Sequence, residues 1–138
     1  MTVAIHDFIQ ALPVGHKTVL LVDDDDSVRQ VARRLLERLG YRVLEAPDAE
    51  GAIHLSSAHD GEIHLLLSDI AMPTMDGLAL AEEVRATRPG IGTLFMSGYA
   101  PGHAARGRFG GASLHHIQKP FEIDAFADAV QKAIKARS

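Results

Sequence analysis

The sequence predicts an α/β domain in which a five-stranded parallel sheet carries helices on both faces. Short apolar runs alternate along the chain with stretches whose apolar residues recur at helical spacing. Five strand–helix units in this strict order favour a parallel sheet, because each crossover places its helix against a face of the sheet. The length of 138 residues, 46% of them hydrophobic, suits one domain with its own core.

The predicted strands are short apolar runs bounded by polar or turn-forming residues. Residues 19–22 form the first, and their four consecutive apolar side chains indicate a strand that is buried on both faces. The remaining strands are predicted at residues 42–45, 64–67, 93–96 and 114–118.

The predicted helices cover residues 27–39, 49–57, 78–86, 104–109 and 124–135. The first has an apolar face made of Val28, Val31, Leu35 and Leu39. Asp26 or Ser27 is expected to cap its start, and Gly40 to end it in a left-handed conformation. The segment 104–109 is expected to be short or partly unwound, because glycines surround it.

Residues 1–16 are predicted to be a leader or a linker remnant, because Pro13 and Gly15 end the only short apolar pattern in them. Residues 17–138 then form the domain. The net charge of −4 gives no reason to expect nucleic-acid binding. No apolar stretch approaches the roughly 18 residues of a membrane span, no signal peptide is evident, and cysteine is absent. We therefore expect a cytoplasmic domain that binds neither nucleic acid nor membrane.

Four consecutive aspartates, residues 23–26, directly follow the first predicted strand. They lie at the carboxyl end of that strand, where open α/β sheets bind their ligands. Crowded carboxylates raise the free energy of the ionised cluster unless a positive charge joins them. Carboxylate oxygen is the natural ligand of a hard divalent cation, so this run predicts part of a metal site.

Three further polar residues follow other predicted strands. Asp69 ends the third strand, Ser97 the fourth and Lys119 the fifth. In a parallel sheet these ends share one edge. This set of groups suits the handling of a phosphoryl group. Carboxylates can hold a cation, another carboxylate can attack phosphorus, and the hydroxyl and the ammonium can contact the transferred oxygens.

Five short segments in this order resemble the receiver domains of bacterial two-component signalling. They are VDDD (22–25), SDIAMP (68–73), MDG (75–77), MSG (96–98) and KPF (119–121), and the resemblance runs from about Lys17 to the end of the chain. It implies a flavodoxin-like fold with strand order 2-1-3-4-5. The sequence also looks like the receivers that are attached to hybrid sensor kinases. A free-standing regulator is the alternative.

The resemblance also implies a role for each site residue. Asp69 would be the phosphoacceptor, taking the group from a phosphohistidine of a sensor histidine kinase or a histidine phosphotransfer protein. Asp24 and Asp69 would ligate Mg²⁺ together with the backbone carbonyl of Ala71, and Asp23 would act on the metal largely through water. Asp25 and Asp26 are instead expected to lead into the first helix and to cap it.

On the same resemblance, Ser97 would donate a hydrogen bond to the phosphoryl group, and Lys119 would pair with Asp69 and then with that group. The bond between Lys119 and Pro120 is expected to be cis, which proline tolerates. The chain departs from the family at His116, where an aromatic switch residue is usual. We hypothesise that His116 replaces that switch and adds pH sensitivity, the alternative being an ordinary half-buried histidine.

A second departure concerns Ala71 and Tyr99, positions that influence how long the phosphoryl group survives in similar domains. The expected function is a phosphorylatable signalling module without turnover of a metabolite. Its output surface, also a candidate for self-association, would combine residues 104–109, 114–118 and 124–135. No output segment is expected after Ile134, so we expect the receiver alone.

Two other functions compete with this prediction. A phosphohydrolase resembling haloacid dehalogenases would use Asp23 as its nucleophile and Asp25 as its acid and base. A flavin-binding domain would share the fold, but four aspartates after the first strand would repel the flavin phosphate.

Overall fold

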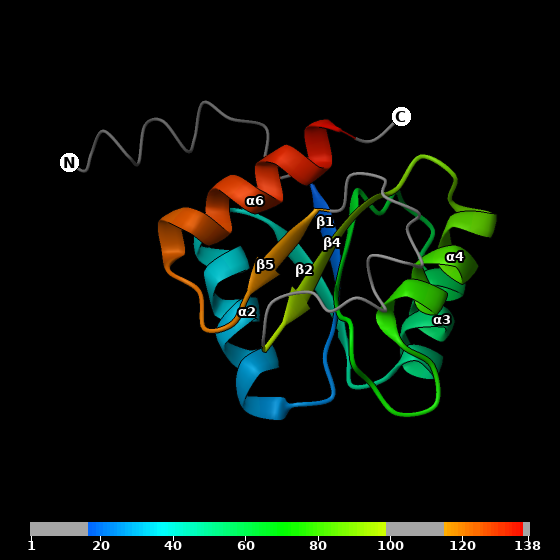
Figure 1. Ribbon diagram of the computed structural model, residues 1–138. Helices are drawn as coiled ribbons and strands as arrows, with labels where there is room; N and C mark the ends of the chain where they lie inside the picture. Colours follow the sequence, from blue (N-terminus) through cyan, green and yellow to red (C-terminus); the bar gives the residue numbers. More distant parts are fainter. Residues whose placement is uncertain (1–16, 99–114, 137–138) are drawn as a thin grey trace.

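One parallel sheet with the strand order β2-β1-β3-β4-β5 organises the chain (Figure 1). The computed structural model describes residues 17–98 and 115–136. The predicted fold class and strand order are confirmed. The strands are β1 (Thr18–Val22), β2 (Arg42–Ala46), β3 (Leu65–Asp69), β4 (Gly92–Ser97) and β5 (His116–Gln118).

Helices cover both faces of the sheet, as predicted. α2 (Asp26–Arg38) and α6 (Ile123–Lys135) pack on one face, and α3 (Ala49–Ala58) and α4 (Gly77–Thr87) pack on the other (Figure 1). β1 and β3 lie between the two layers, and all their residues are buried. None of the helices in the described part of the chain combines the length and the apolar character that a bilayer span requires.

The register of the strands aligns their carboxyl ends. Val22, the last residue of β1, pairs with Ser68, which precedes Asp69. Asp69 in turn pairs with Met96, and Ser97 pairs with Gln118. The residues that follow β1 and β5 therefore emerge at the same edge as the ends of β3 and β4.

Most predicted element boundaries lie within two residues of the observed ones. β5 begins at His116, so the predicted strand over residues 114–118 starts too early, since His115 lies outside it. The helix predicted over residues 104–109 and the leader predicted over residues 1–16 lie outside the described residues.

The predicted buried side of the first helix is wrong in part. α2 buries Ala32 and Leu36, whereas Val31 is 52% exposed. Helical periodicity defines which residues share a side, but the apolar stripe of α2 is wide, and contact with the sheet selects only part of it. Of the predicted capping residues Asp25, Asp26 and Ser27, the cap is Asp25, because its carboxylate accepts hydrogen bonds from the first free backbone N–H groups of the helix.

Gly40 ends α2 as predicted. Its φ is 95°, a backbone conformation that residues with a Cβ rarely adopt. We expect Gly40→Ala to lower the free energy of unfolding by about 1–2 kcal/mol, because alanine must adopt the left-handed conformation. Urea denaturation followed by circular dichroism measures this change.

Gly98→Ala is the matched control. An added Cβ at Gly98 meets no atom within 4 Å, and its φ is not positive. It is expected to leave stability unchanged or slightly raised, since alanine reduces the entropy of the unfolded chain. Equal losses in both variants would refute the role assigned to Gly40.

Candidate functional site

Three carboxylates from two strand ends meet at the edge of the sheet. Asp23 and Asp24 follow β1, and Asp69 is the last residue of β3. One oxygen atom of each lies within 4.8 Å of those of the other two. Asp23 is fully buried and Asp69 almost so, whereas Asp24 is exposed. The cluster predicted from the sequence is thus assembled by the parallel register.

Lys119, which directly follows β5, brings a positive charge into this cluster. Its Nζ lies 3.3 Å from Asp23 Oδ2 and 3.5 Å from Asp69 Oδ1. The backbone N–H of Lys119 donates to the carbonyl of Ser97 at 2.7 Å, and the peptide bond to Pro120 is cis, as predicted. The lysine is therefore held through its backbone as well as through its ammonium.

The charges in the cluster are unequal, with one ammonium among three carboxylates. Burial raises the pKa of Asp69 above its ordinary value, and the negative charge of Asp23 raises it further, while Lys119 lowers it in part. Burial alone would lower the pKa of Lys119, but the charges of Asp23 and Asp69 outweigh this effect and raise it. Excess negative charge on oxygen ligands is the environment that suits a hard cation such as Mg²⁺.

The backbone around Asp69 is fixed from two sides. The hydroxyl of Ser68 donates to the carbonyl of Asp69 at 2.9 Å, inside the buried strand. Gly77, the first residue of α4, packs so close to that carbonyl that a Cβ added there would overlap its oxygen. The N–H of Gly77 donates to Ile70, so the loop after β3 closes beneath the carboxylate.

Ser97 and Ala71 occupy the predicted places relative to Asp69. Ser97 is buried at the end of β4, the strand beside β3. Ala71 is exposed in the loop, two residues beyond Asp69. Tyr99, the partner position of Ala71, lies outside the described residues.

His116 begins β5 and lies opposite Phe95 of β4. It is half-buried, and its Nε2 is buried with no hydrogen-bond partner in residues 17–98 and 115–136. Burial lowers the pKa of His116, which favours the neutral ring. Its role as a switch stays a prediction.

Asp25 is engaged in a structural role. Its carboxylate accepts hydrogen bonds from the backbone N–H groups of Ser27 at 2.9 Å and Val28 at 3.2 Å. An acid and base at this position would have to give up the cap of α2. Asp23 is fully buried, whereas 7% of Asp69 is exposed.

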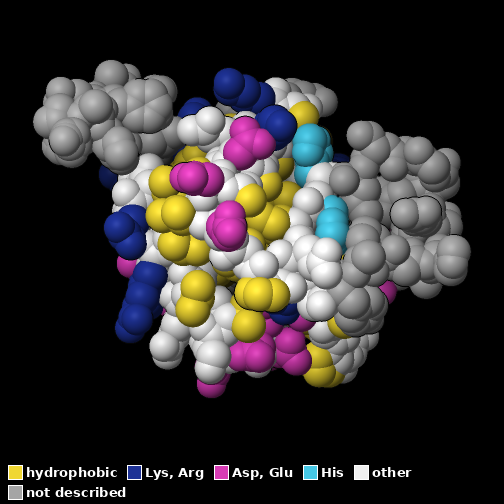
Figure 2. Space-filling model, turned by 60° about the vertical axis from the view of Figure 1, so that its left-hand side comes forward, with side chains coloured by type: hydrophobic (Ala, Val, Ile, Leu, Met, Phe, Trp, Pro, Cys, Tyr) yellow, Lys and Arg dark blue, Asp and Glu magenta, His cyan; other side chains and the backbone are white. Residues whose placement is uncertain are grey.

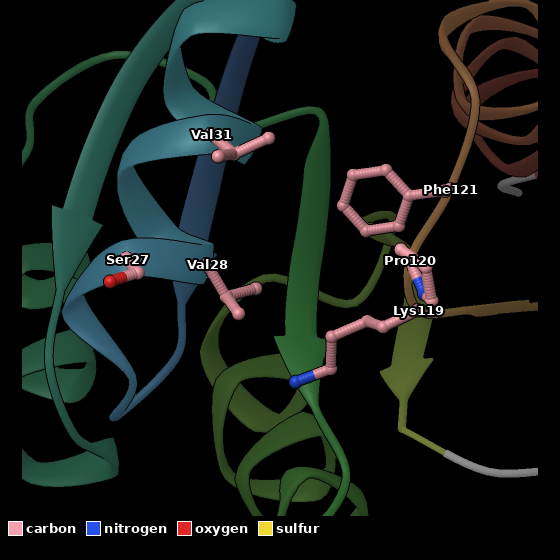
Figure 3. A pocket seen from close by; sticks show the side chains of 6 residues that line it. All are labelled: Ser27, Val28, Val31, Lys119, Pro120 and Phe121. Atoms are coloured by element: carbon pink, nitrogen blue, oxygen red, sulfur yellow. The ribbon is translucent and has the colours of Figure 1, made fainter.

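An apolar groove of about 390 Å³ adjoins the cluster, a feature that the sequence did not reveal. Ser27, Val28 and Val31 of α2 form one wall, and Lys119, Pro120 and Phe121 form the other (Figure 3). Phe121 stacks on Phe126 of α6, with ring centroids 4.8 Å apart. Hydrophobic side chains gather on this face of the molecule, with acidic side chains close by (Figure 2).

Comparisons with known proteins agree with the site. The model of the family described as the response regulator receiver domain matches residues 19–131. The sensor kinase CckA of Brucella abortus is 38% identical over 121 residues, which cover 88% of this chain. The DNA-binding transcriptional regulator NtrC of Escherichia coli K12 is 34% identical over 116 residues, or 84% of this chain. The chain spans only 13% and 24% of the lengths of these two relatives.

Solved structures with the same fold include two receiver domains. The receiver domain of the hybrid histidine kinase CckA is 36% identical, with a TM-score of 0.69 over 85% of this chain and 98% of that one. A CheY-like receiver domain protein from Methanospirillum hungatei JF-1 is 28% identical, with a TM-score of 0.72 over 86% of this chain and 94% of that one.

The raised pKa of Asp69 predicts that this residue lowers the stability of the metal-free protein in a pH-dependent way. Because the folded state holds this proton to higher pH than the unfolded state, the contribution of Asp69 to stability falls as pH rises through its folded pKa. Asp69→Asn removes the buried charge. Its melting temperature, measured in EDTA, should therefore exceed that of the wild type by several degrees near pH 7 and converge with it towards pH 4.

Asp60→Asn, which neutralises an exposed carboxylate, is the control and should leave the melting temperature nearly unchanged at both pH values. A difference between Asp69→Asn and the wild type that does not vary with pH would contradict the electrostatic explanation.

Proposed function

The chain belongs to the response regulator receiver domain family of two-component signalling, and from this premise we propose that it accepts a phosphoryl group on Asp69 in a Mg²⁺-dependent reaction. Receiver domains of this family are phosphoacceptors. The observation that supports the assignment to Asp69 most directly is the meeting of Asp23, Asp24, Asp69 and Lys119 at one edge of the sheet.

In this proposal Asp24, Asp69 and the carbonyl of Ala71 would hold Mg²⁺ directly, and Asp23 would act on it largely through water. The ion supplies positive charge that offsets the negative oxygens of an incoming phosphoryl group. A carboxylate oxygen of Asp69 forms the new bond to phosphorus while the bond from phosphorus to the donor atom breaks. The buried position of Asp69 excludes water from most of its surroundings, which strengthens each electrostatic contact there.

Lys119 and Ser97 would contact the transferred group. The ammonium of Lys119, already directed at Asp23 and Asp69, is placed to pair with a phosphoryl oxygen once Asp69 is modified. Ser97 lies on the neighbouring strand end and would donate its hydroxyl to another oxygen. Such new contacts would favour a second conformation, a population shift that serves as the signal. The neutral ring of His116 would respond to it.

The proposed phosphodonor is a sensor histidine kinase or a histidine phosphotransfer protein. The donor has to bring a phosphohistidine to Asp69, and Lys119, which contacts Asp69, also lines the apolar groove. Val31, half exposed on its rim, gives a partner helix an apolar contact. We propose that this groove contacts the donor. Self-association through residues 104–109, 114–118 and 124–135, and a cytoplasmic location, remain predictions.

Phosphorylation by acetyl phosphate tests the function without a protein donor. We expect the wild type with Mg²⁺ to gain one hydroxylamine-labile phosphoryl group and Asp69→Asn to gain none. Omitting Mg²⁺ should abolish the reaction. At a Mg²⁺ concentration of about 100 times Kd, binding should also raise the free energy of unfolding by about 2.7 kcal/mol. Intact-mass spectrometry and thermal melts measure both effects.

Asp25→Asn is the control, since Asp25 caps α2 and asparagine also caps helices well. It should retain phosphorylation. A phosphoryl group that persists in Asp69→Asn and maps to Asp23 would overturn the assignment in favour of the competing hydrolase chemistry.

The groove predicts a difference between protein donors and acetyl phosphate. With an autophosphorylated histidine kinase that phosphorylates the wild type, Val31→Asp should slow transfer about tenfold or more, because it places a charge in an apolar contact. Phosphorylation by acetyl phosphate should be unchanged.

Ala86→Asp provides the matched control, since it adds the same charge to an exposed position of α4 on the opposite face of the sheet. Its transfer rate should equal that of the wild type. If Val31→Asp and Ala86→Asp transfer at the same rate, the groove is not the contact surface.

A further inference from the structure

Arg29 contacts the loop of residues 23–25 that follows β1, here called the acidic loop, and donates hydrogen bonds from all three of its side-chain nitrogens. Nη1 donates to the backbone carbonyl of Asp23 at 2.8 Å, and Nη2 to Asp26 Oδ1 at 2.7 Å. Nε donates to Glu45 Oε1 at 3.1 Å. The side chain is only 14% exposed, although it begins on the first turn of a surface helix. One guanidinium thus connects the loop, the helix and a strand.

Glu45 anchors this arrangement to the sheet. It belongs to β2 and pairs with Leu21 of β1 in the register. Its second carboxylate oxygen accepts a 2.7 Å hydrogen bond from Arg33, one turn further along α2. Both oxygens of Glu45 are therefore engaged, and Arg29 joins a residue of β2 to the loop.

The bond to the Asp23 carbonyl bears directly on the site. This carbonyl belongs to the peptide unit that joins Asp23 to Asp24, and a peptide unit is planar. Fixing its oxygen fixes the direction in which the chain enters Asp24. On the other side, the carboxylate of Asp23 accepts from the N–H of Asp25 at 2.9 Å and contacts Lys119. The chain is therefore restrained at the carbonyl of Asp23 and, one peptide unit further on, at the N–H of Asp25.

We propose that Arg29 is a positioning residue of the acidic site: by holding the Asp23–Asp24 peptide against Glu45, it sets the relative placement of the two carboxylates and hence the affinity for Mg²⁺. The proposal rests on the function proposed above. Arg29 touches neither the metal nor the phosphoryl group, so it acts through the geometry of the loop. Outer partners of this kind change metal affinity about 10- to 100-fold when they are removed.

Arg33 provides a matched control for the simpler explanation that only charge matters. It lies one turn away on the same helix and binds the same glutamate, but it pairs with Glu45 and Glu37 rather than with the acidic loop. Removing either arginine deletes one positive charge and one bond to Glu45. Only the removal of Arg29 also releases the Asp23 carbonyl.

The test compares Arg29→Gln with Arg33→Gln by calorimetric titration of the metal-free proteins with MgCl₂. We expect Kd to rise about tenfold or more in Arg29→Gln. In Arg33→Gln the Kd for Mg²⁺ should stay within about twofold of the wild type, because Arg33 has no bond to the acidic loop. A second readout needs no metal: the amide resonances of Asp24 and Asp25 should shift in Arg29→Gln and remain in place in Arg33→Gln.

A loss of melting temperature in Arg29→Gln with an unchanged Kd would overturn the proposal, because Arg29 would then be structural only. Equal values of Kd in the two variants would also overturn it. Should Arg29→Gln fail to fold, Arg29→Lys and Arg33→Lys decide, since both keep the charge. Lysine cannot make three directed bonds in the plane of a guanidinium, so weaker Mg²⁺ binding only in Arg29→Lys supports the proposal.

The outcomes separate this proposal from the proposed function. If the wild type binds no Mg²⁺ and is not phosphorylated on Asp69, the proposed function itself fails. If the wild type does both and the arginine variants do not differ, only the role of Arg29 fails. At saturating Mg²⁺, Arg29→Gln should still be phosphorylated by acetyl phosphate on Asp69.

Discussion

The structure depends on the confinement of three carboxylates and one ammonium at the edge of a parallel sheet. Each of these charges follows or ends a strand, and the register brings together residues that are 96 positions apart in sequence, as in the pair of Asp23 and Lys119. Burial of the Asp69 carboxylate, and then the negative charge of Asp23 beside it, raise the pKa of Asp69, so its ionised form opposes folding. The site therefore attracts positive charge. A metal ion would relieve the repulsion among the carboxylates, and a phosphoryl group without a metal ion would increase it.

The surrounding scaffold restrains the backbone of the charged residues. Arg29 holds the carbonyl of Asp23, and Ser68 holds that of Asp69, while Gly77 leaves just enough space for the latter. None of these groups belongs to the set of carboxylates and lysine. Their common effect is to prevent mutually repelling side chains from moving apart, because separation would require the backbone to move with them.

One short segment links the charged cluster to the apolar groove. Lys119 reaches the carboxylates with its ammonium and lines the groove with the rest of its side chain, and Pro120 and Phe121 continue the same wall (Figure 3). Phe121 in turn stacks on Phe126 in the core beneath α6. A change in the pairing of Lys119 is therefore adjacent to the surface on which a partner would rest, without an intervening element.

The order and type of the described elements could be predicted from the amino-acid sequence, as could the meeting of acidic and basic residues at the carboxyl ends of the strands. Local properties suffice for this, since apolar runs, strand-end positions and residue chemistry are all written along the chain. The tertiary contacts, by contrast, determine which side of α2 is buried, that Arg29 connects Glu45 to the acidic loop, and that Val31 and Phe121 border a groove. These features depend on how far each helix is rotated against the sheet and on which distant side chains then meet. Periodicity leaves that rotation open, because the apolar stripe of α2 is wider than the surface that the sheet covers.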